Sequence, residues 1–222
     1  MNKDRKNILS EALAAFLSAL TLAAAIIYFQ PGKNRGLANI LIAAVWLYLP
    51  IIFIAARKSG FSGLALDKLS AGQSIKWFAI VSITIFPVFY LAAGLGATGI
   101  LHWQFNLKIP DRFWSFVIGQ LLLISLPEEF FFRGYLQGRL NQALGKKWKF
   151  LAAEIGPGLF IAAALFALAH FAFQPYPDRL LVFFPALVFG WLREKTDSLI
   201  APVLFHFSSN LSFIIFQLSL IK

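Results

Sequence analysis

The chain has 222 residues, of which 59% are hydrophobic and 14% are charged, and its formal net charge is +10. With a mean hydropathy of +0.73, this composition excludes a soluble globular domain and is typical of a polytopic membrane protein. The sequence contains no cysteine, which excludes disulfides, thiolate metal sites and cysteine nucleophiles.

Seven apolar runs follow one another along the chain, and most are near the roughly 20 residues that a helix needs to cross a bilayer. The short fourth run is expected to continue through Glu128 and Glu129 to about Leu144, as one long helix or as a pair broken at Pro127. We therefore expect an all-α fold, a polytopic membrane bundle of seven to eight transmembrane helices. In chain order the runs are 8–29, 37–56, 77–101, 113–126, 155–173, 180–192 and 199–221.

No linker, repeat or charge block divides the chain, so residues 1–222 are expected to form a single transmembrane domain. The first run follows Lys3, Arg5 and Lys6 and is too long for a signal peptide, which indicates a retained helix. Most lysines and arginines fall in the segments on the side of the N-terminus. The positive-inside rule then predicts a multi-pass protein with a cytoplasmic N-terminus and an outward C-terminus, as in a bacterial or archaeal cell membrane.

Two adjacent carboxylates, Glu128 and Glu129, and the guanidinium of Arg133 lie inside an apolar run. Ionisable residues inside membrane segments usually face a protein interior or a water-filled cavity and mark a functional site. On a helix, Glu129 and Arg133 share a face and can pair, whereas Glu128 points about 100° away. The guanidinium would hold Glu129 ionised and in place, and Glu128 would be the base. An ion pair that merely joins two helices is the structural alternative.

Two histidines and an asparagine lie in later apolar runs. His206 and Asn210 are four residues apart, so their side chains can donate to one point, as an oxyanion hole requires. Phe166 and His170 have the same spacing, and the ring could pack beside the imidazole. With Glu128, these residues predict a hydrolase in which Glu128 and His170 hold a water molecule. That water would attack a peptide carbonyl polarised by His206 and Asn210, without a covalent intermediate.

Three ordered motifs carry a resemblance to a known family: Glu-Glu-x-x-x-Arg, Phe-x-x-x-His and His-x-x-x-Asn. Together they resemble the CPBP family of CAAX-type intramembrane glutamic endopeptidases, over a catalytic core of about 113–212. The helices within 8–101 carry no motif of this family. The resemblance implies a membrane protease without metal or cofactor. Its substrate would be a peptide or a membrane-associated protein, with or without a lipid group. It implies the catalytic residues Glu128, His170, His206 and Asn210, and the supporting residues Glu129, Arg133 and Phe166.

Other functions stay open on the sequence. A zinc-dependent membrane protease is one, although the chain lacks His-Glu-x-x-His and an arginine-paired glutamate is a poor zinc ligand. A transporter or proton relay also uses buried glutamate, arginine and histidine, but has no obvious need for an oxyanion clamp. A non-catalytic membrane scaffold or a bacteriocin-immunity-type protein would keep the fold without the chemistry. No nucleic-acid partner is expected, because the positive charges form no basic domain.

Overall fold

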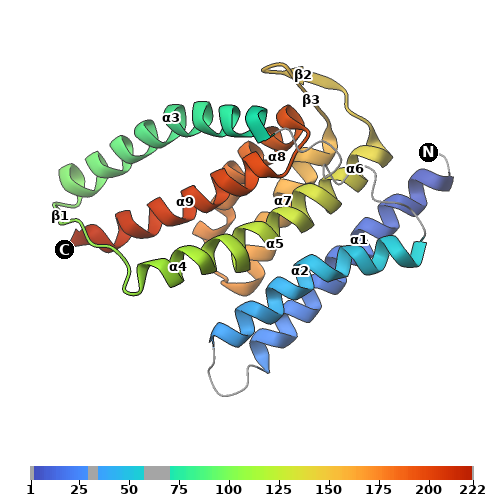
Figure 1. Cartoon of the computed structure of the whole chain (residues 1–222), viewed down its shortest axis with the longest axis horizontal. Coiled ribbons are helices and arrows are strands. Elements are labelled where there is room, and N and C mark those ends of the chain that lie inside the picture. The colour runs from blue at the N-terminus through green and yellow to red at the C-terminus, as the bar shows by residue number, and fades with distance from the viewer. Residues whose placement is uncertain (1–2, 30–34, 58–70, 222) are drawn as a thin grey trace.

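The protein is described by a computed structural model over residues 3–29, 35–57 and 71–221. The described chain forms seven helical segments whose ends alternate between two sides of the molecule, with the termini on opposite sides (Figure 1). The fourth segment is one long helix that spans Phe113–Leu144. The others are α1 (Lys3–Tyr28), α2 (Arg35–Arg57), α3 (Ala71–Leu95) with the π-helical extension η2 (Gly96–Ile100), α7 (Pro157–Phe173), α8 (Phe183–Thr196) and α9 (Ile200–Ser219).

The described helices have the length and surface of a membrane protein. Large apolar side chains are well exposed, among them Ile83 at 74% and Val88 at 68%, and such a surface is stable in lipid rather than in water. Five helices are long and apolar enough to cross a bilayer, and Pro157–Phe173 is a shorter apolar helix. The long ones are Lys3–Tyr28, Gly36–Arg57, Ala71–Ile100, Phe113–Leu144 and Ile200–Ser219. The all-α polytopic fold is thus confirmed, with five long apolar candidate spans among the seven described segments.

The long fourth helix runs without a break through Pro127, so the continuous helix is the correct alternative and the broken pair is wrong. Two π-helical segments flank the glutamate pair. Proline lacks an N–H and its ring clashes with the carbonyl four residues earlier, and the wider π turn before Pro127 accommodates both effects. In order, the segments are α4 (Phe113–Gly119), η3 (Gln120–Ser125), α5 (Leu126–Glu129), η4 (Phe130–Leu136) and α6 (Gln137–Leu144).

Besides the helices, the described chain contains two small antiparallel sheets, and the apolar runs did not predict these sheets. Strand β2 (Trp148–Phe150) pairs with β3 (Ala153–Ile155), so the helix expected from residue 155 begins only at Pro157. Strand β1 (Gln104–Phe105) pairs with β4 (Leu220–Ile221) and ties the end of α9 to the connection after α3. The run expected over 180–192 is a 3-10 turn, η5 (Pro177–Val182), followed by α8.

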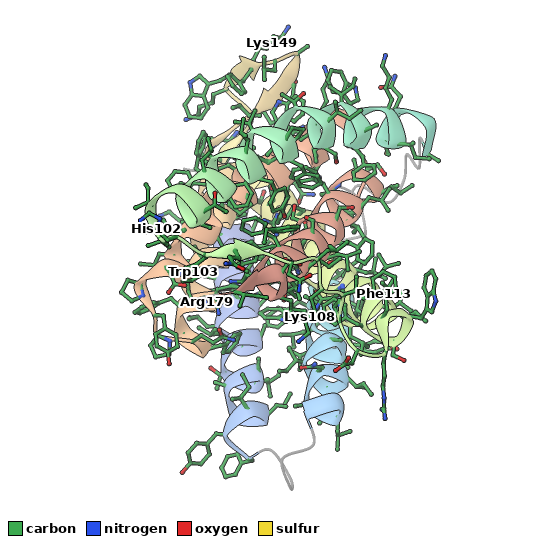
Figure 2. The ribbon with its side chains drawn as sticks, turned by 90° about the vertical axis from the view of Figure 1, so that its left-hand side faces the viewer. His102, Trp103, Lys108, Phe113, Lys149 and Arg179 are labelled. Atoms are coloured by element: carbon green, nitrogen blue, oxygen red, sulfur yellow. The ribbon has the colours of Figure 1, made fainter. Side chains whose placement is uncertain are left out.

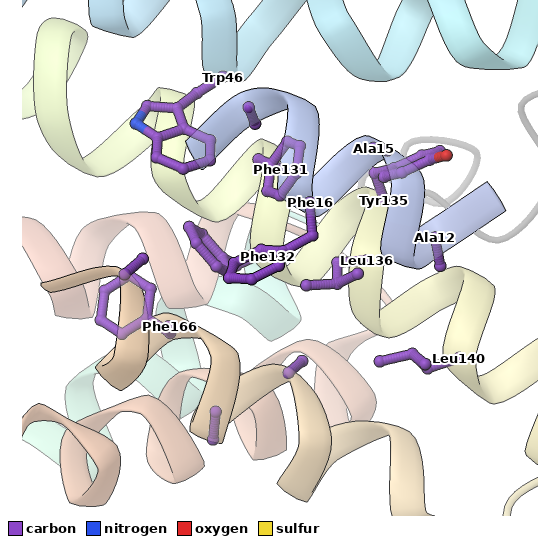
Figure 3. Close-up of a cluster of buried hydrophobic side chains, with 14 of the residues drawn as sticks. Ala12, Ala15, Phe16, Trp46, Phe131, Phe132, Tyr135, Leu136, Leu140 and Phe166 are labelled. Atoms are coloured by element: carbon purple, nitrogen blue, oxygen red, sulfur yellow. The ribbon is translucent and has the colours of Figure 1, made fainter. Parts of the chain in front are cut away.

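The largest buried core joins the first two helices to the long fourth helix and α7 (Figure 3). Helix α1 contributes a face of alanines with no exposed surface, and small residues let helices in a membrane approach closely. Aromatic rings fill the space beyond them: the Trp46 ring lies 4.8 Å from Phe131, and the Phe132 ring lies 4.9 Å from Phe166. The fully buried alanines of α1 are Ala12, Ala15, Ala19 and Ala23.

A close approach between α6 and α7 depends on a glycine. A Cβ added at Gly158 would lie 2.5 Å from the side-chain Oδ1 of Asn141 and 3.0 Å from the Asn141 backbone N. Asn141 cannot withdraw freely, because its Nδ2 donates a 2.7 Å hydrogen bond to the buried carboxylate of Glu194 in α8. The same carboxylate accepts from Gln137 at 2.6 Å. This polar cluster fixes the C-terminal half of the long helix against α8.

Candidate active site

The carboxylate of Glu129 has no exposed surface and is the centre of the site. Its Oε1 accepts a 2.8 Å hydrogen bond from Nη1 of Arg133, the pairing that their spacing on the helix predicts. The same oxygen lies 2.8 Å from Nδ1 of His206, which comes from α9. The bond to Arg133 lies within the long fourth helix, and the bond to His206 joins that helix to α9.

Arg133 is 1% exposed and is held on several sides. Its Nη2 donates to the backbone carbonyl of Ala186 in α8 at 3.3 Å. The guanidinium carbon lies 4.3 Å from the centre of the Phe166 ring and 4.9 Å from the centre of the Phe189 ring. Aromatic faces attract a guanidinium, most strongly where water is excluded. Arg133 is therefore positioned by α7 and α8 as well as by its own helix.

His206 bridges the two glutamates. Its ring stacks on Phe189, with the ring centres 4.8 Å apart and the planes at 15°. Because an ionised carboxylate can only accept, Nδ1 of His206 must carry the hydrogen that is shared with Glu129. The other nitrogen, Nε2, lies 3.9 Å from Oε2 of Glu128. That distance is too long for a direct hydrogen bond, so His206 is hydrogen-bonded to Glu129 and only close to Glu128.

The two adjacent glutamates have different surroundings. The side chain of Glu129 is 0% exposed and is bonded to Arg133 and His206, whereas that of Glu128 is 17% exposed. Within the described part of the chain, Oε2 has no hydrogen-bond partner in either glutamate, so the difference lies in the two bonds to Oε1 of Glu129 and in the greater exposure of Glu128. Glu129 is thus held in place by Arg133 and His206, whereas among the described residues no ion pair or hydrogen bond as short as these holds the Glu128 carboxylate.

His170 lies near the end of α7, one turn after Phe166. Its Nδ1 is 3.0 Å from the backbone carbonyl of Phe166, and since a carbonyl only accepts, Nδ1 carries the hydrogen. Its Nε2 then has a lone pair. The Phe166 ring contacts both imidazoles, with its centre 4.3 Å from His170 and 5.9 Å from His206. Among the described residues no hydrogen bond joins His170 to Glu128, so the expected shared water is not defined by a direct contact between them.

A cavity of about 660 Å³ opens beside these residues, and its walls are mainly aromatic and aliphatic. His170, His206 and Asn210 all line it, although they come from different parts of the chain. Asn210 donates from Nδ2 to Oε1 of Gln120, at 3.3 Å, across to the long fourth helix. One wall is formed by a face of α3, with Ile85, Phe86, Phe89 and Tyr90.

Sequence reasoning missed two residues that support the site. Gln120, the partner of Asn210, is a polar side chain within an apolar run, and that pattern could have marked it. Phe189, which stacks on His206 and contacts Arg133, is one of 25 phenylalanines and gave no signal.

No group of three His, Cys, Asp or Glu side chains arranged to hold a metal ion occurs in the described ranges.

A comparison with protein-family models finds a similarity over the second half of the chain. The model for Rce1-like proteins, described as type II CAAX prenyl endopeptidase Rce1-like, matches residues 110–212. The matched segment contains Glu128, Glu129, His206 and every other residue of the buried cluster and the three motifs. No curated protein and no solved structure matches the chain.

Proposed function

Residues 110–212 form a domain of the Rce1-like type II CAAX prenyl endopeptidase family, which makes this membrane protein a peptide hydrolase, and we propose that it cleaves peptide bonds with a water molecule activated by Glu128. The observation that carries the proposal is the buried cluster in which His206 lies between Glu129 and Glu128. This cluster adjoins a cavity with apolar walls, where an extended peptide segment can bind without competing water.

Glu128 is the base in this proposal. Its Oε2 is shielded from solvent and has no hydrogen-bond partner among the described residues, so a water molecule that donates to it would satisfy a buried acceptor. As the water oxygen attacks the carbonyl carbon, its proton passes to the Glu128 carboxylate, and no covalent enzyme intermediate forms. When the carbon–nitrogen bond breaks, the same proton passes to the leaving amine, so that Glu128 ends the cycle ionised.

His206 and Asn210 stabilise the oxyanion. Because Nδ1 of His206 already donates to Glu129, its Nε2 can donate to an oxyanion only if the ring carries a second proton. With that second proton, the cluster of Glu128, Glu129, Arg133 and His206 would pair two negative charges with two positive charges. Asn210 supplies the second donor when its amide leaves Gln120.

His170 orients the attacking water. Its Nδ1 is engaged by the Phe166 carbonyl, so its Nε2 is an acceptor on the wall of the cavity. An acceptor at that position holds the water's second hydrogen while Glu128 takes the first. His170 and Glu128 make no direct contact. We propose that the water molecule, held against the bound substrate, connects the two side chains by donating one hydrogen to each.

The experiment that tests this function is a digest of a peptide library and of membrane proteins by the purified protein in detergent. The wild type, Glu128→Ala and His170→Ala are compared by mass spectrometry, each with and without a chelator. Cleavage by the wild type alone, unaffected by the chelator, supports the proposal. Loss of cleavage on chelation, restored by zinc, would instead identify a zinc protease, and a biological output unchanged in Glu128→Ala would identify a scaffold.

We also propose that the N-terminus lies in the cytoplasm. The side of the bundle that holds the N-terminus also holds the β2–β3 hairpin and the end of α8, which bring several basic residues to it (Figure 1). Because the chain has no cysteine, a single introduced cysteine is a unique label. Lys149→Cys should resist a membrane-impermeant thiol reagent in intact cells, and Lys108→Cys should react; the reverse pattern would invert the topology.

In this proposal the substrate is a peptide or a membrane-associated protein segment.

A further inference from the structure

Arg179 lines the cavity but has no role in the chemistry proposed above. It lies in η5, the turn between α7 and α8, and among the described lining residues it is the only lysine or arginine. Its Nε is shielded from solvent and has no hydrogen-bond partner. Within the described ranges the guanidinium forms no ion pair. A guanidinium donor that loses water without gaining a partner is unfavourable, and a ligand that accepts from it removes the penalty.

The backbone holds Arg179 close to His170. The N–H of Gln174 donates to the carbonyl of His170 at 3.0 Å, and the N–H of Arg179 donates to the carbonyl of Tyr176 at 2.9 Å. Prolines on both sides of Tyr176 restrict this short connection further. Arg179 and His170 line the same cavity. Figure 2 faces the end of the molecule on which Arg179 lies.

The surroundings of Arg179 favour a carboxylate as its partner. The planar guanidinium presents paired donors that match the two oxygens of a carboxylate. Asp178, the adjacent residue, also lines the cavity, but it is exposed and makes no ion pair with Arg179. The remaining walls around the guanidinium are largely apolar, including Leu181, Val182 and Phe184. A peptide that fills the cavity therefore meets a single lysine or arginine side chain, that of Arg179, among the described lining residues.

We propose that Arg179 binds a carboxylate of the substrate peptide and so determines which peptide bond reaches Glu128. The proposal rests on the proposed function. A peptide held by its carboxylate at Arg179 extends through the cavity toward His206 and Asn210, so the cleaved bond lies at a fixed spacing from that carboxylate. The carboxylate can belong to the free C-terminus of the peptide or to an aspartate or glutamate side chain.

Binding tests this inference independently of cleavage. Three sets of short, apolar synthetic peptides are applied to the Glu128→Gln protein in detergent: sets with a free C-terminal carboxylate, with a C-terminal amide, and with an amide plus one internal aspartate. We expect the acid-ended peptides to bind about ten- to a hundredfold more tightly than their amides, and Arg179→Gln to abolish this difference. Tight binding of the peptides with an internal aspartate, lost in Arg179→Gln, would show that a side-chain carboxylate can also bind Arg179.

Lys108→Gln is the matched control, because it removes one positive charge from an exposed side chain outside the cavity, and Figure 2 labels it on the same end of the molecule. Equal binding of all three peptide sets, or a preference that survives in Arg179→Gln, would overturn the inference. Arg179→Lys keeps the charge but not the paired donors, and we expect it to retain part of the preference. A preference for acid-ended peptides together with no cleavage by the wild type would refute the proposed function and leave this inference standing.

Discussion

The adjacent glutamates can be tested by one isosteric change at each position. In Glu129→Gln the amide loses the negative charge that pairs with buried Arg133 and with His206, both at 2.8 Å from the same oxygen. Breaking a buried ion pair from one side costs about 3–5 kcal/mol. Because an amide oxygen still accepts hydrogen bonds, we expect about 3 kcal/mol, or a fall of roughly 10 °C in Tm for a chain of this size.

In Glu128→Gln the result should be the opposite. The side chain is 17% exposed and its Oε2 has no partner in the described part of the chain, so we expect a change in unfolding free energy below about 1 kcal/mol. Cleavage should nevertheless fall by about 10²- to 10⁴-fold, the contribution of a positioned general base. Thermal unfolding in detergent measures stability, and initial cleavage rates are normalised to folded protein. Equal destabilisation by both changes, or an active Glu128→Gln beside a folded but inactive Glu129→Gln, would refute the assignment.

Three further changes test the rest of the site and its frame. Asn210→Ala should lower kcat by about 10²- to 10³-fold with little change in KM, as measured by steady-state kinetics, because it removes an oxyanion donor. Arg133→Lys keeps a positive charge but loses the forked donors and the stacking between two aromatic rings, so both Tm and cleavage rate should fall. Gly158→Ala should destabilise the fold by about 1–3 kcal/mol, because the added Cβ meets Asn141. Gly94→Ala is the control and should unfold like the wild type, because nothing lies within 4 Å of its added Cβ. Equal unfolding midpoints for the two variants would contradict the packing argument.

The sequence predicted the helices and the pairs that lie on one helix, because helical spacing determines which side chains share a face. The ion pair of Glu129 with Arg133 and the contact of Phe166 with His170 follow from a spacing of four residues. The bond between His206 and Glu129 could not be predicted in this way. It joins residues 77 positions apart, and it depends on how α9 packs against the long helix.

Three features could not be predicted from the sequence: the β2–β3 hairpin, the packing of Phe189 on His206 and the continuous helix at Pro127. Each has a physical reason. The hairpin from Trp148 to Ile155 has no turn signal of glycine, asparagine or proline at its centre, where Leu151 and Ala152 adopt positive φ. The support of His206 by Phe189 depends on packing between helices rather than on a local pattern. The continuity of the helix at Pro127 depends on a π turn, which sequence periodicity does not reveal.

The N-terminal helices carry no catalytic motif, yet they determine where the glutamates lie. Glu129 and Arg133 face α8 and α9, while Phe131 and Tyr135 of the same helix face α1 and α2. Tyr135 donates to the buried carboxylate of Glu11 in α1 at 3.0 Å, and Phe131 packs on Trp46 in α2. The helix that carries Glu128, the proposed base, is therefore held from both sides. Because general-base catalysis is sensitive to displacements of about 1 Å, the proposed mechanism gives the first two helices a positioning role, although none of their described residues lines the cavity.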